Sequence, residues 1–298
     1  MKRLNPLNDY LFQKYLGEKG DEEQLLSFLN AVLYKTGKEK LVHVEILENK
    51  TLTADIIGSK TSILDIRAIA DNNTRANIEI QLKNIGGNMD RRSLFYWSRE
   101  YSKSISAGQE YTELPNVIAV NITNFEFIRL ADFHTTFHLW EDSYKDYMLT
   151  DALEIHFVDM VKFKRQQSKD IKNNPLHRWM LFFDKDTPEE VLKEIFDMEE
   201  AIKKANEKIT YLASDEDAIR LYEMREMAMF DYTSGMNSAR REGIAQGRSE
   251  GITQGESSKS IEIATNLIMD GVDAGIIAKA TGLDESAIVR LKVEIEVP

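Results

Sequence analysis

The sequence has no cysteine and no long apolar run, and each absence excludes a class of protein. Without cysteine there is no disulfide framework, no thiolate zinc site and no cysteine nucleophile, so any metal must use oxygen or imidazole ligands. No apolar run approaches the roughly 20 residues of a membrane helix, and the N-terminus lacks an apolar stretch of signal-peptide length. We therefore expect a cytoplasmic protein without a membrane partner.

Histidine, the remaining nitrogen ligand for metals, is scarce, with five residues. Only His134 and His138 have the i,i+4 spacing of a metal-binding pair. Because they lie in an aromatic-rich segment, we favour ordinary packing for them. The carboxylates are then the candidate metal ligands.

The net charge of −12 argues against a nucleic-acid binder, because non-specific affinity for DNA comes mainly from Lys and Arg. The acidity, however, is concentrated in the C-terminal third. Residues 1–184 carry 24 Lys and Arg against 26 Asp and Glu, whereas residues 185–298 carry 14 against 24. A basic stretch from Lys162 to Arg178 is equally compatible with a solvated surface and with phosphate contacts. DNA binding thus stays open for the first part of the chain.

The first half of the chain predicts helices and strands in alternation. Apolar residues have helical spacing over 7–16 and 22–34, and Asn8 or Asp9 is suited to cap the first helix. Runs rich in Val, Ile and Leu predict strands, with a helix over about 88–107 between the third and the fourth. This order favours an α/β core. The predicted strands are 41–47, 62–71, 75–83, 115–122 and 151–163.

Beyond about residue 175 the pattern is helical, with long charged helices near 188–208 and 215–233. Glycine then recurs every four residues from Gly243 to Gly255, and each interior glycine costs a helix roughly 1 kcal/mol relative to alanine. We interpret this repeat as a weak helix or hinge, with close helix packing in a dimer as the alternative. The predicted division is a core at 1–175, a helical extension at 176–235, the glycine repeat at 236–258 and a small helical unit at 259–298.

The small C-terminal unit has the spacing of a helix-turn-helix. Gly282 is placed to form the tight turn, and Ala278, Ile288 and Leu291 are placed to pack the two helices together. DNA reading is not favoured here, since the second helix begins with Asp284-Glu285 and has few cations. The helical tail offers amphipathic surface, so we expect a homodimer through the C-terminal helices.

The main chemical signal comes from strands 62–71 and 75–83, whose apolar and polar residues alternate in phase. A hairpin buries both apolar rows on one face and aligns both polar rows on the other. Matching the faces pairs odd residues with odd ones, so Asp65 lies opposite either Glu79 or Gln81. Both registers bring the carboxylates of Asp65 and Glu79 within reach of one cation such as Mg²⁺. The apolar rows are Leu64, Ile66, Ala68 and Ala70, and Ala76, Ile78, Ile80 and Leu82.

On periodicity alone, a plainer interpretation is favoured over a metal site. Two carboxylates on a polar strand face are common, and such a face is usually exposed to solvent. Asp65 and Glu79 would then simply pair with Arg67 and Lys83.

The same strands resemble the D…E-x-Q form of the PD-(D/E)XK nuclease signature, with Asp65 in Ile63-Leu64-Asp65-Ile66 and the other residues in Ile78-Glu79-Ile80-Gln81. The chain is identified as a member of the recombination-promoting nucleases of that superfamily, which are also called transposases. The resemblance covers roughly residues 4–165. It includes Asn8–Phe12, Arg91–Trp97, Gly108–Tyr111 and Pro115–Val120.

This resemblance implies a fold, an activity and a site. The fold is a restriction-endonuclease-like α/β core, a mixed sheet flanked by helices, with an all-helical C-terminal extension. The activity is metal-dependent hydrolysis of DNA phosphodiester bonds, in the service of recombination, mobile elements or defence. Asp65, Glu79 and the Ile80 carbonyl would hold Mg²⁺, or else Mn²⁺ or Ca²⁺, and Gln81 would position the attacking water.

Gln81 departs from the superfamily, which usually has lysine at this position. A neutral amide offers no positive charge to the water or the phosphate, so we expect a lower intrinsic rate. Lys83, on the same face, is the candidate for the missing charge. The alternative is a catalytically weak or inactive nuclease fold that acts as a DNA-binding or protein-interaction module.

The helix predicted over 88–107 presents a basic stripe suited to hold the DNA backbone, formed by Arg92, Arg99 and Lys103. A solvated helix face is the alternative. Leu94, Tyr101 and Ile105, at the same spacings, are predicted to form the buried side. Arg67 and Lys83 on the polar strand face complete the candidate DNA contacts.

Overall fold

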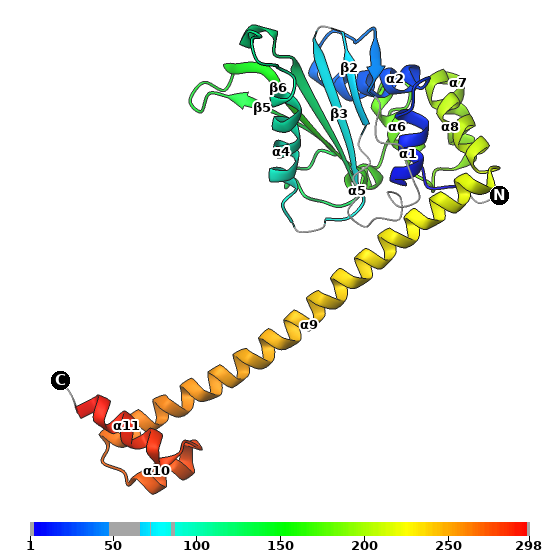
Figure 1. Cartoon of the computed structure of the whole chain (residues 1–298). Helices are drawn as coiled ribbons and strands as arrows, with labels where there is room; N and C mark the ends of the chain where they lie inside the picture. The colour runs from blue at the N-terminus through cyan, green and yellow to red at the C-terminus, as the bar shows by residue number, and fades with distance from the viewer. Residues whose placement is uncertain (1–2, 48–65, 72, 85–86, 297–298) are drawn as a thin grey trace. The chain divides into compact units, whose positions relative to one another are not determined.

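The computed structural model describes residues 3–47, 66–71, 73–84 and 87–296 (Figure 1). Contacts divide the chain into two units, Met1–Met229 and Phe230–Pro298. Asp65, the first predicted metal ligand, lies outside the described residues.

A mixed six-stranded sheet forms the centre of the first unit, in the order β1-β2-β3-β4-β6-β5. The central strands β3, β4 and β6 are parallel, and β1, β2 and β5 run antiparallel to their neighbours. The predicted α/β order is confirmed. The strands are β1 (Val44–Ile46), β2 (Ile66–Ala70), β3 (Thr74–Gln81), β4 (Asn116–Thr123), β5 (His134–Trp140) and β6 (Met148–Asp159).

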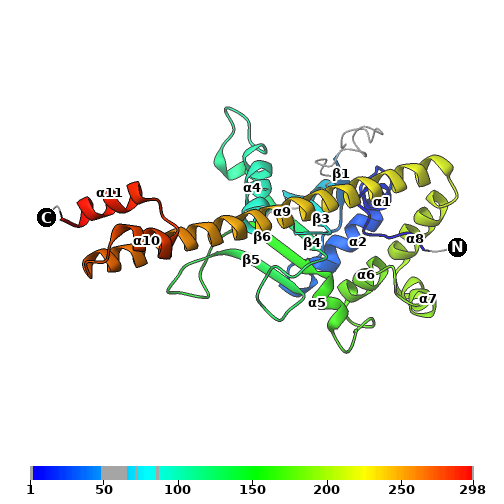
Figure 2. The same ribbon diagram turned by 90° about the horizontal axis from the view of Figure 1, so that it is seen from below.

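Two features of the sheet differ from the expectation. The aromatic-rich strand β5 was not predicted, and it forms the sheet edge opposite β1 (Figure 2). Strand β6 ends at Asp159 instead of running to residue 163, because the Asp159 carboxylate accepts hydrogen bonds from the backbone N–H groups of Val161 and Lys162. That cap starts α5 (Met160–Arg165) and so ends the strand.

One face of the sheet is covered by helices that bury a large apolar core. Asn8 caps the first of these, as one of the two predicted candidates. Aromatic rings from distant parts of the sequence meet there, including Phe12, Phe28 and Trp179, and make edge-to-face contacts. The helices are α1 (Asp9–Leu16), α2 (Glu22–Leu33), α6 (Pro175–Phe183), α7 (Glu189–Met198) and α8 (Glu200–Leu212).

The opposite face of the sheet is covered by α4 (Met89–Ser102), which connects the parallel strands β3 and β4 (Figure 1). Two short 3₁₀ helices, η1 (Tyr34–Thr36) and η2 (Tyr111–Glu113), lie in connecting loops. This helix–strand order is consistent with the PD-(D/E)XK fold.

The long helix α9 (Glu216–Met269) begins in the first unit and ends in the second. Its first turns are anchored to α1, since the Arg225 guanidinium, 2% exposed, makes a bidentate ion pair with Asp9. The glycine repeat from Gly243 to Gly255 lies within this helix.

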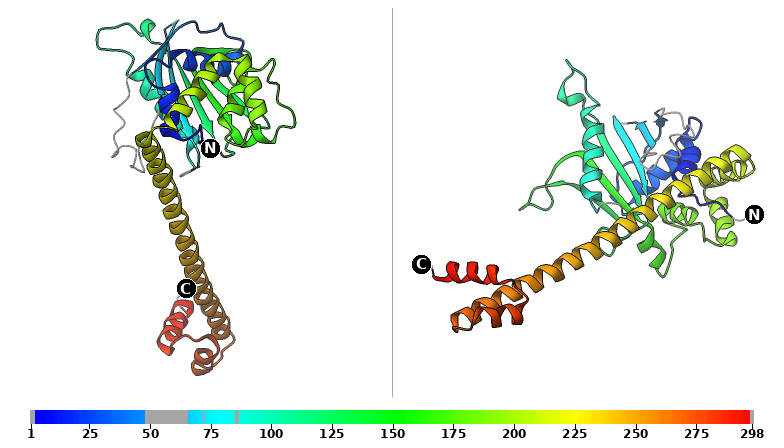
Figure 3. Two further views of the ribbon diagram at one scale, coloured as in Figure 1. Left: turned by 90° about the vertical axis from the view of Figure 1, so that its right-hand side faces the viewer. Right: turned by 60° about the horizontal axis from the view of Figure 1, so that its bottom comes forward.

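In the second unit, α10 (Ala274–Thr281) and α11 (Glu285–Glu296) pack beside the end of α9 (Figure 3). Ile277 and Ile288 are buried between them, and Gly282 ends α10 in the left-handed conformation with φ of 72°. The predicted helix-turn-helix packing is confirmed. In the described part of the chain, no helix combines the length and the apolar character needed to cross a bilayer.

Candidate active site

The polar row predicted on β3 lies under α4, and its middle part is buried. Its apolar counterparts, such as Ile66 and Ile78, face the large core as expected. On the other side, Asn77 and Glu79 are only 8% and 3% exposed. The solvent-facing interpretation of this row is therefore wrong for Glu79, because α4 shields it from water.

The strand register fixes the neighbours of the row. Ile66 pairs with Ile78 and Arg67 with Asn77, so odd residues face odd ones as predicted. On the parallel side, Glu79 pairs with Asn121 of β4. Polar side chains of two strands thus gather where β3 and β4 end.

Arg92 of α4 joins the two motif residues of β3. Its Nη2 donates to Glu79 Oε1 at 2.7 Å, and its Nη1 donates to Gln81 Oε1 at 3.1 Å. Gln81 Nε2 in turn donates to Glu79 Oε1 at 3.3 Å. The result is a buried carboxylate that shares a guanidinium with the neighbouring amide. A charged donor to a carboxylate is among the stronger hydrogen bonds in proteins.

Polar contacts also fix the rest of α4 on the sheet. Ser93 Oγ lies 2.9 Å from Asn121 Oδ1, and one helical turn further on Trp97 Nε1 donates to the Val117 carbonyl at 3.0 Å. Near the end of the helix, Arg75 Nη1 and Glu100 Oε1 form an ion pair at 3.0 Å. These directional bonds place Arg92 over Glu79 more specifically than apolar packing alone does.

The predicted orientation of α4 is wrong. Leu94, expected on the buried side, is 50% exposed, and Ile105 lies beyond the end of the helix. The reason is that α4 packs on the sheet through Met89, Ser93 and Glu100, over both polar side chains and a small apolar cluster that includes Ala119 and Ile155. For the same reason Arg92 contacts the sheet and does not belong to an outward basic stripe.

The other predicted DNA contacts are dispersed. Arg67 is half-buried on β2, Lys83 is exposed just beyond β3, and Arg99 and Lys103 are exposed at the end of α4. Sequence reasoning missed Asn121 as a site residue. The available signal was an amide within the otherwise apolar run Val117-Ile118-Ala119-Val120-Asn121-Ile122.

Most cations of the basic stretch from Lys162 to Arg178 form contacts within the protein. Lys162 Nζ donates to the carbonyls of Ile128 and Leu130 at 2.5 and 2.6 Å, and Lys164 pairs with Asp184 at 2.7 Å. Arg165 pairs with Glu126, Lys169 donates to two backbone carbonyls and Arg178 pairs with Glu199. These contacts favour a structural role over phosphate binding.

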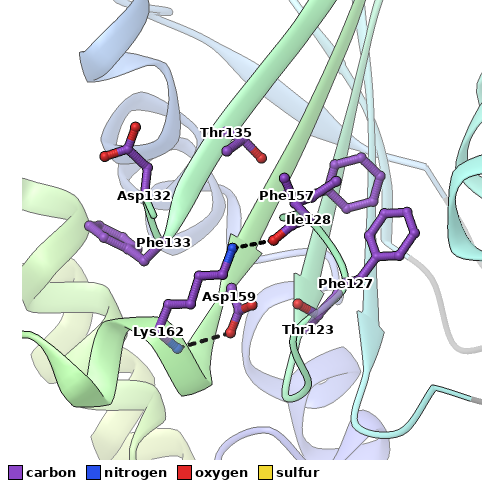
Figure 4. Close-up of a pocket in the computed structure, with 9 residues that line it drawn as sticks. All are labelled: Thr123, Phe127, Ile128, Asp132, Phe133, Thr135, Phe157, Asp159 and Lys162. Carbon is purple, nitrogen blue, oxygen red and sulfur yellow. Dashed lines mark hydrogen bonds between the residues drawn. The ribbon is translucent and has the colours of Figure 1, made fainter. Parts of the chain in front are cut away.

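A small cavity lies beside the carboxyl ends of β4 and β6 (Figure 4). Thr123, Thr135 and Asp159 line it, and Lys162 closes one side by its bond to the Ile128 carbonyl. Burial raises the pKa of Asp159. At about 10 Å³ the cavity has room for one water molecule and excludes a nucleotide.

Comparison with known families decides the family. The family model described as "PD-(D/E)XK nuclease family transposase" matches residues 6–239, which is more than half of the chain. The protein belongs to this family. No curated protein and no solved structure matches the chain.

Glu79 and Gln81, the signature residues expected from the sequence, both lie on β3, within the matched range. The match also extends past the sheet through α6, α7 and α8 into α9. Among the described residues there is no group of three or more His, Cys, Asp and Glu side chains arranged to hold a metal ion.

A second buried carboxylate lies on the opposite face of the sheet. Glu154 of β6 is 0% exposed, pairs with Lys38 and lies 2.9 Å from His156 Nε2. His134 of β5 extends this series of hydrogen-bonding contacts, since its Nε2 lies 2.9 Å from His156 Nδ1. His138 Nε2 lies 3.8 Å from Glu154, so both predicted histidines belong to one polar cluster.

Ionisation in this cluster is strongly perturbed. Burial opposes the charge of Glu154, but the hydrogen bonds and charges of His156 and Lys38 outweigh it and hold the carboxyl pKa well below its usual value. Burial, together with the charges of His156 and Lys35, lowers the pKa of His134 to about 3. The cluster is therefore a charged carboxylate with a neutral His134 at pH 7.

Proposed function

We propose that this protein is a divalent-metal-dependent deoxyribonuclease that hydrolyses phosphodiester bonds of DNA. The observation that carries the proposal is the shared contact of Arg92 with Glu79 and Gln81, at the carboxyl end of β3. In open α/β sheets, ligands usually bind outside the carboxyl ends of the strands. Membership of a nuclease family supports the same site.

Asp65 and Glu79 are proposed to hold the metal. Asp65 directly precedes Ile66 in the sequence, and Ile66 pairs with Ile78, which directly precedes Glu79. The donors available from β3 are the Glu79 carboxylate, the Gln81 amide oxygen and the Ile80 carbonyl. All are hard oxygens, which suit Mg²⁺, Mn²⁺ or Ca²⁺ and fit no metal that requires thiolates.

When bound, the ion would acidify an attacking water and neutralise charge that develops on the phosphate. The chain's own groups would complete the site. Glu79, buried under α4, keeps its carboxylate in a fixed position. Gln81, held by Arg92, turns its amide toward the same side of β3 and orients the water. Because α4 limits solvent access, charge interactions at this site are stronger than they would be in bulk water.

Arg92 is proposed to supply the positive charge that Gln81 lacks. Its guanidinium contacts both motif residues, whereas Lys83, the candidate from the sequence, is exposed beyond the strand. Since arginine stays charged at any working pH, it can neutralise Glu79 before the metal binds and contact a phosphate oxygen afterwards. A lysine on β3 is then not required.

The remaining assignments are proposals about the wider role. The activity would serve recombination, mobile elements or defence, with DNA as the substrate in the cytoplasm. Residues 1–175 would carry the nuclease core, with 176–235, 236–258 and 259–298 as successive helical parts. Exposed apolar residues of α9, such as Ile244 and Ile252, support pairing of two chains through the C-terminal helices. Two copies would provide the two sites that a double-strand cut needs.

Nicking of supercoiled plasmid tests the proposal. We expect cleavage with Mg²⁺, Mn²⁺ or Ca²⁺, its loss in EDTA, and a fall of at least about 100-fold in both Asp65→Asn and Glu79→Gln. Glu45→Gln is the matched control, because Glu45 is an exposed carboxylate on β1 of the same sheet. Full cleavage by Glu79→Gln, or cleavage in EDTA, contradicts the site. Metal-independent DNA binding without cleavage would favour the binding-module alternative.

A further inference from the structure

The outward face of α4 carries an exposed aromatic ring between two arginines. Arg91, Phe95 and Arg99 are four residues apart, so they form one row along the helix, with about 6 Å of rise between neighbours. Phe95 is 60% exposed and the adjacent Leu94 is 50% exposed. The row lies opposite the side on which Ser93 and Glu100 contact the sheet.

Contacts connect this row to the motif residues. Arg92, which bonds Glu79, lies over the Tyr96 ring with 5.8 Å between the guanidinium carbon and the ring centroid. The Tyr96 ring in turn contacts the Phe95 ring edge-to-face at 5.7 Å. The exposed Phe95 ring is thus connected to Glu79 through contacts of Tyr96 and Arg92.

The two arginines of the row are available for a ligand. In the part of the chain that the structure describes, neither Arg91 nor Arg99 has a carboxylate within ion-pair distance. By contrast, Arg75 and Arg92 on the sheet side are both paired with glutamates. Unpaired cations beside an exposed ring match the chemistry of a nucleic-acid strand, with anionic phosphates and flat bases.

We propose that the outer face of α4 binds single-stranded DNA, with a base stacked on Phe95 and phosphates on Arg91 and Arg99. The inference rests on the proposed nuclease function and names the form of DNA that the site takes. In a duplex both faces of a base are covered by neighbouring pairs, so a ring fixed on a helix can stack only on an unpaired base. The form of DNA that this surface favours is therefore one with a single-stranded segment.

Binding without metal tests this inference separately from cleavage. The probes are a labelled single-stranded oligonucleotide of about 12 nucleotides and a blunt duplex of equal length, measured by fluorescence anisotropy in EDTA. Phe95→Ala should weaken single-strand binding by about 5- to 100-fold and change duplex binding by less than about twofold. Phe95→Trp should retain the affinity, because it keeps a stacking surface.

Tyr111→Ala is the matched control, since Tyr111 is an 85% exposed aromatic residue on η2 outside the row. It should leave both affinities unchanged. Arg91→Gln and Arg99→Gln should each reduce the slope of log affinity against log salt by about 0.7 for the single strand. These slopes report phosphate contacts, which a structural role of the arginines would not affect.

Three results overturn the inference: unchanged single-strand binding by Phe95→Ala, equal loss for the duplex, or a changed mass of Phe95→Ala in light scattering. The last would mean that a second copy covers this face. Glu79→Gln separates the two proposals, because it should bind the oligonucleotide normally in EDTA. Phe95-dependent binding without cleavage contradicts the nuclease alone, whereas cleavage without Phe95-dependent binding contradicts the single-strand surface alone.

Discussion

Two buried carboxylates of the sheet, Glu79 on one face and Glu154 on the other, each pair with a cation from another element. Glu79 is 3% exposed and pairs with Arg92, and Glu154 is 0% exposed and pairs with Lys38. They differ in their position along the strands. Glu79 lies two residues before the end of β3, whereas Glu154 lies in the middle of β6. Burial and pairing alone therefore do not distinguish the two carboxylates, whereas ligands of open α/β sheets usually bind outside the carboxyl ends of the strands, near which Glu79 lies.

The comparison predicts opposite outcomes for substitutions of Glu79 and Glu154. The largest expected effect is that on DNA cleavage when Glu79 is replaced. Glu79→Gln should reduce DNA cleavage by at least about 100-fold, because an amide is a poor ligand for a hard cation. Stability should change by about 1 kcal/mol at most, since glutamine still accepts from Arg92, whose side chain is partly exposed at 29%. Plasmid nicking and a thermal melt on the same preparation check both parts. A large loss of stability would mean that Glu79 has a structural role, as we expect for Glu154.

Substitution of Glu154 should change stability instead of chemistry. Glu154→Leu leaves Lys38 and His156 without their carboxylate, and removal of one partner from a buried ion pair costs about 3 to 5 kcal/mol. Cleavage per folded molecule should stay at the wild-type level. Urea denaturation followed by nicking under native conditions measures the two quantities. Cleavage that falls while the fold stays intact would give this cluster a part in the reaction.

The cluster also predicts how stability depends on pH. His134 has a folded-state pKa of about 3, below its usual 6.5, so the unfolded chain binds more protons between these values. Stability should therefore fall on acidification below pH 6.5, by about 1 kcal/mol or less per pH unit. The lowered pKa of Glu154 adds a further loss below pH 4.5. Urea midpoints at pH 7.5, 6 and 5 measure this dependence. They should vary less with pH in His134→Gln than in the wild type. In the exposed control His43→Gln they should vary with pH as in the wild type.

Much of the first strand pair could be predicted from the sequence. Alternation of Ile66, Ala68, Ala76 and Ile78 with polar residues requires odd residues to pair with odd ones, and this parity is observed. The turn glycine Gly282 could be predicted as well, because few other residues adopt a positive φ at a helix end. Both features depend on local pattern, which one sequence contains.

Features that depend on packing could not be predicted in this way. The side of α4 that faces inward is set by the polar groups and the small apolar cluster beneath it, so Leu94 is exposed, whereas Tyr101 is half-buried and stacks on Trp97. His134 and Glu154 are brought together by β5 pairing with β6, which helical or strand periodicity does not reveal. The contact of Arg92 with Glu79 was not predicted, because a sequence does not show which carboxylate a guanidinium will meet.

The last prediction concerns where the positive charge beside Glu79 has to lie. Arg92→Gln removes that charge and should lower cleavage by about 10- to 100-fold, while the glutamine keeps one hydrogen bond to the sheet. Gln81→Lys alone puts a second cation next to Arg92, and their repulsion should leave activity at or below the wild-type level. In the double variant, the lysine on β3 takes the place of the guanidinium on α4, so about tenfold of the lost activity should return. Such a recovery requires a coupling between the two positions that independent, purely structural roles do not produce. If the two losses simply multiply in the double variant, Arg92 acts by placing α4, and the charge itself is not part of the chemistry.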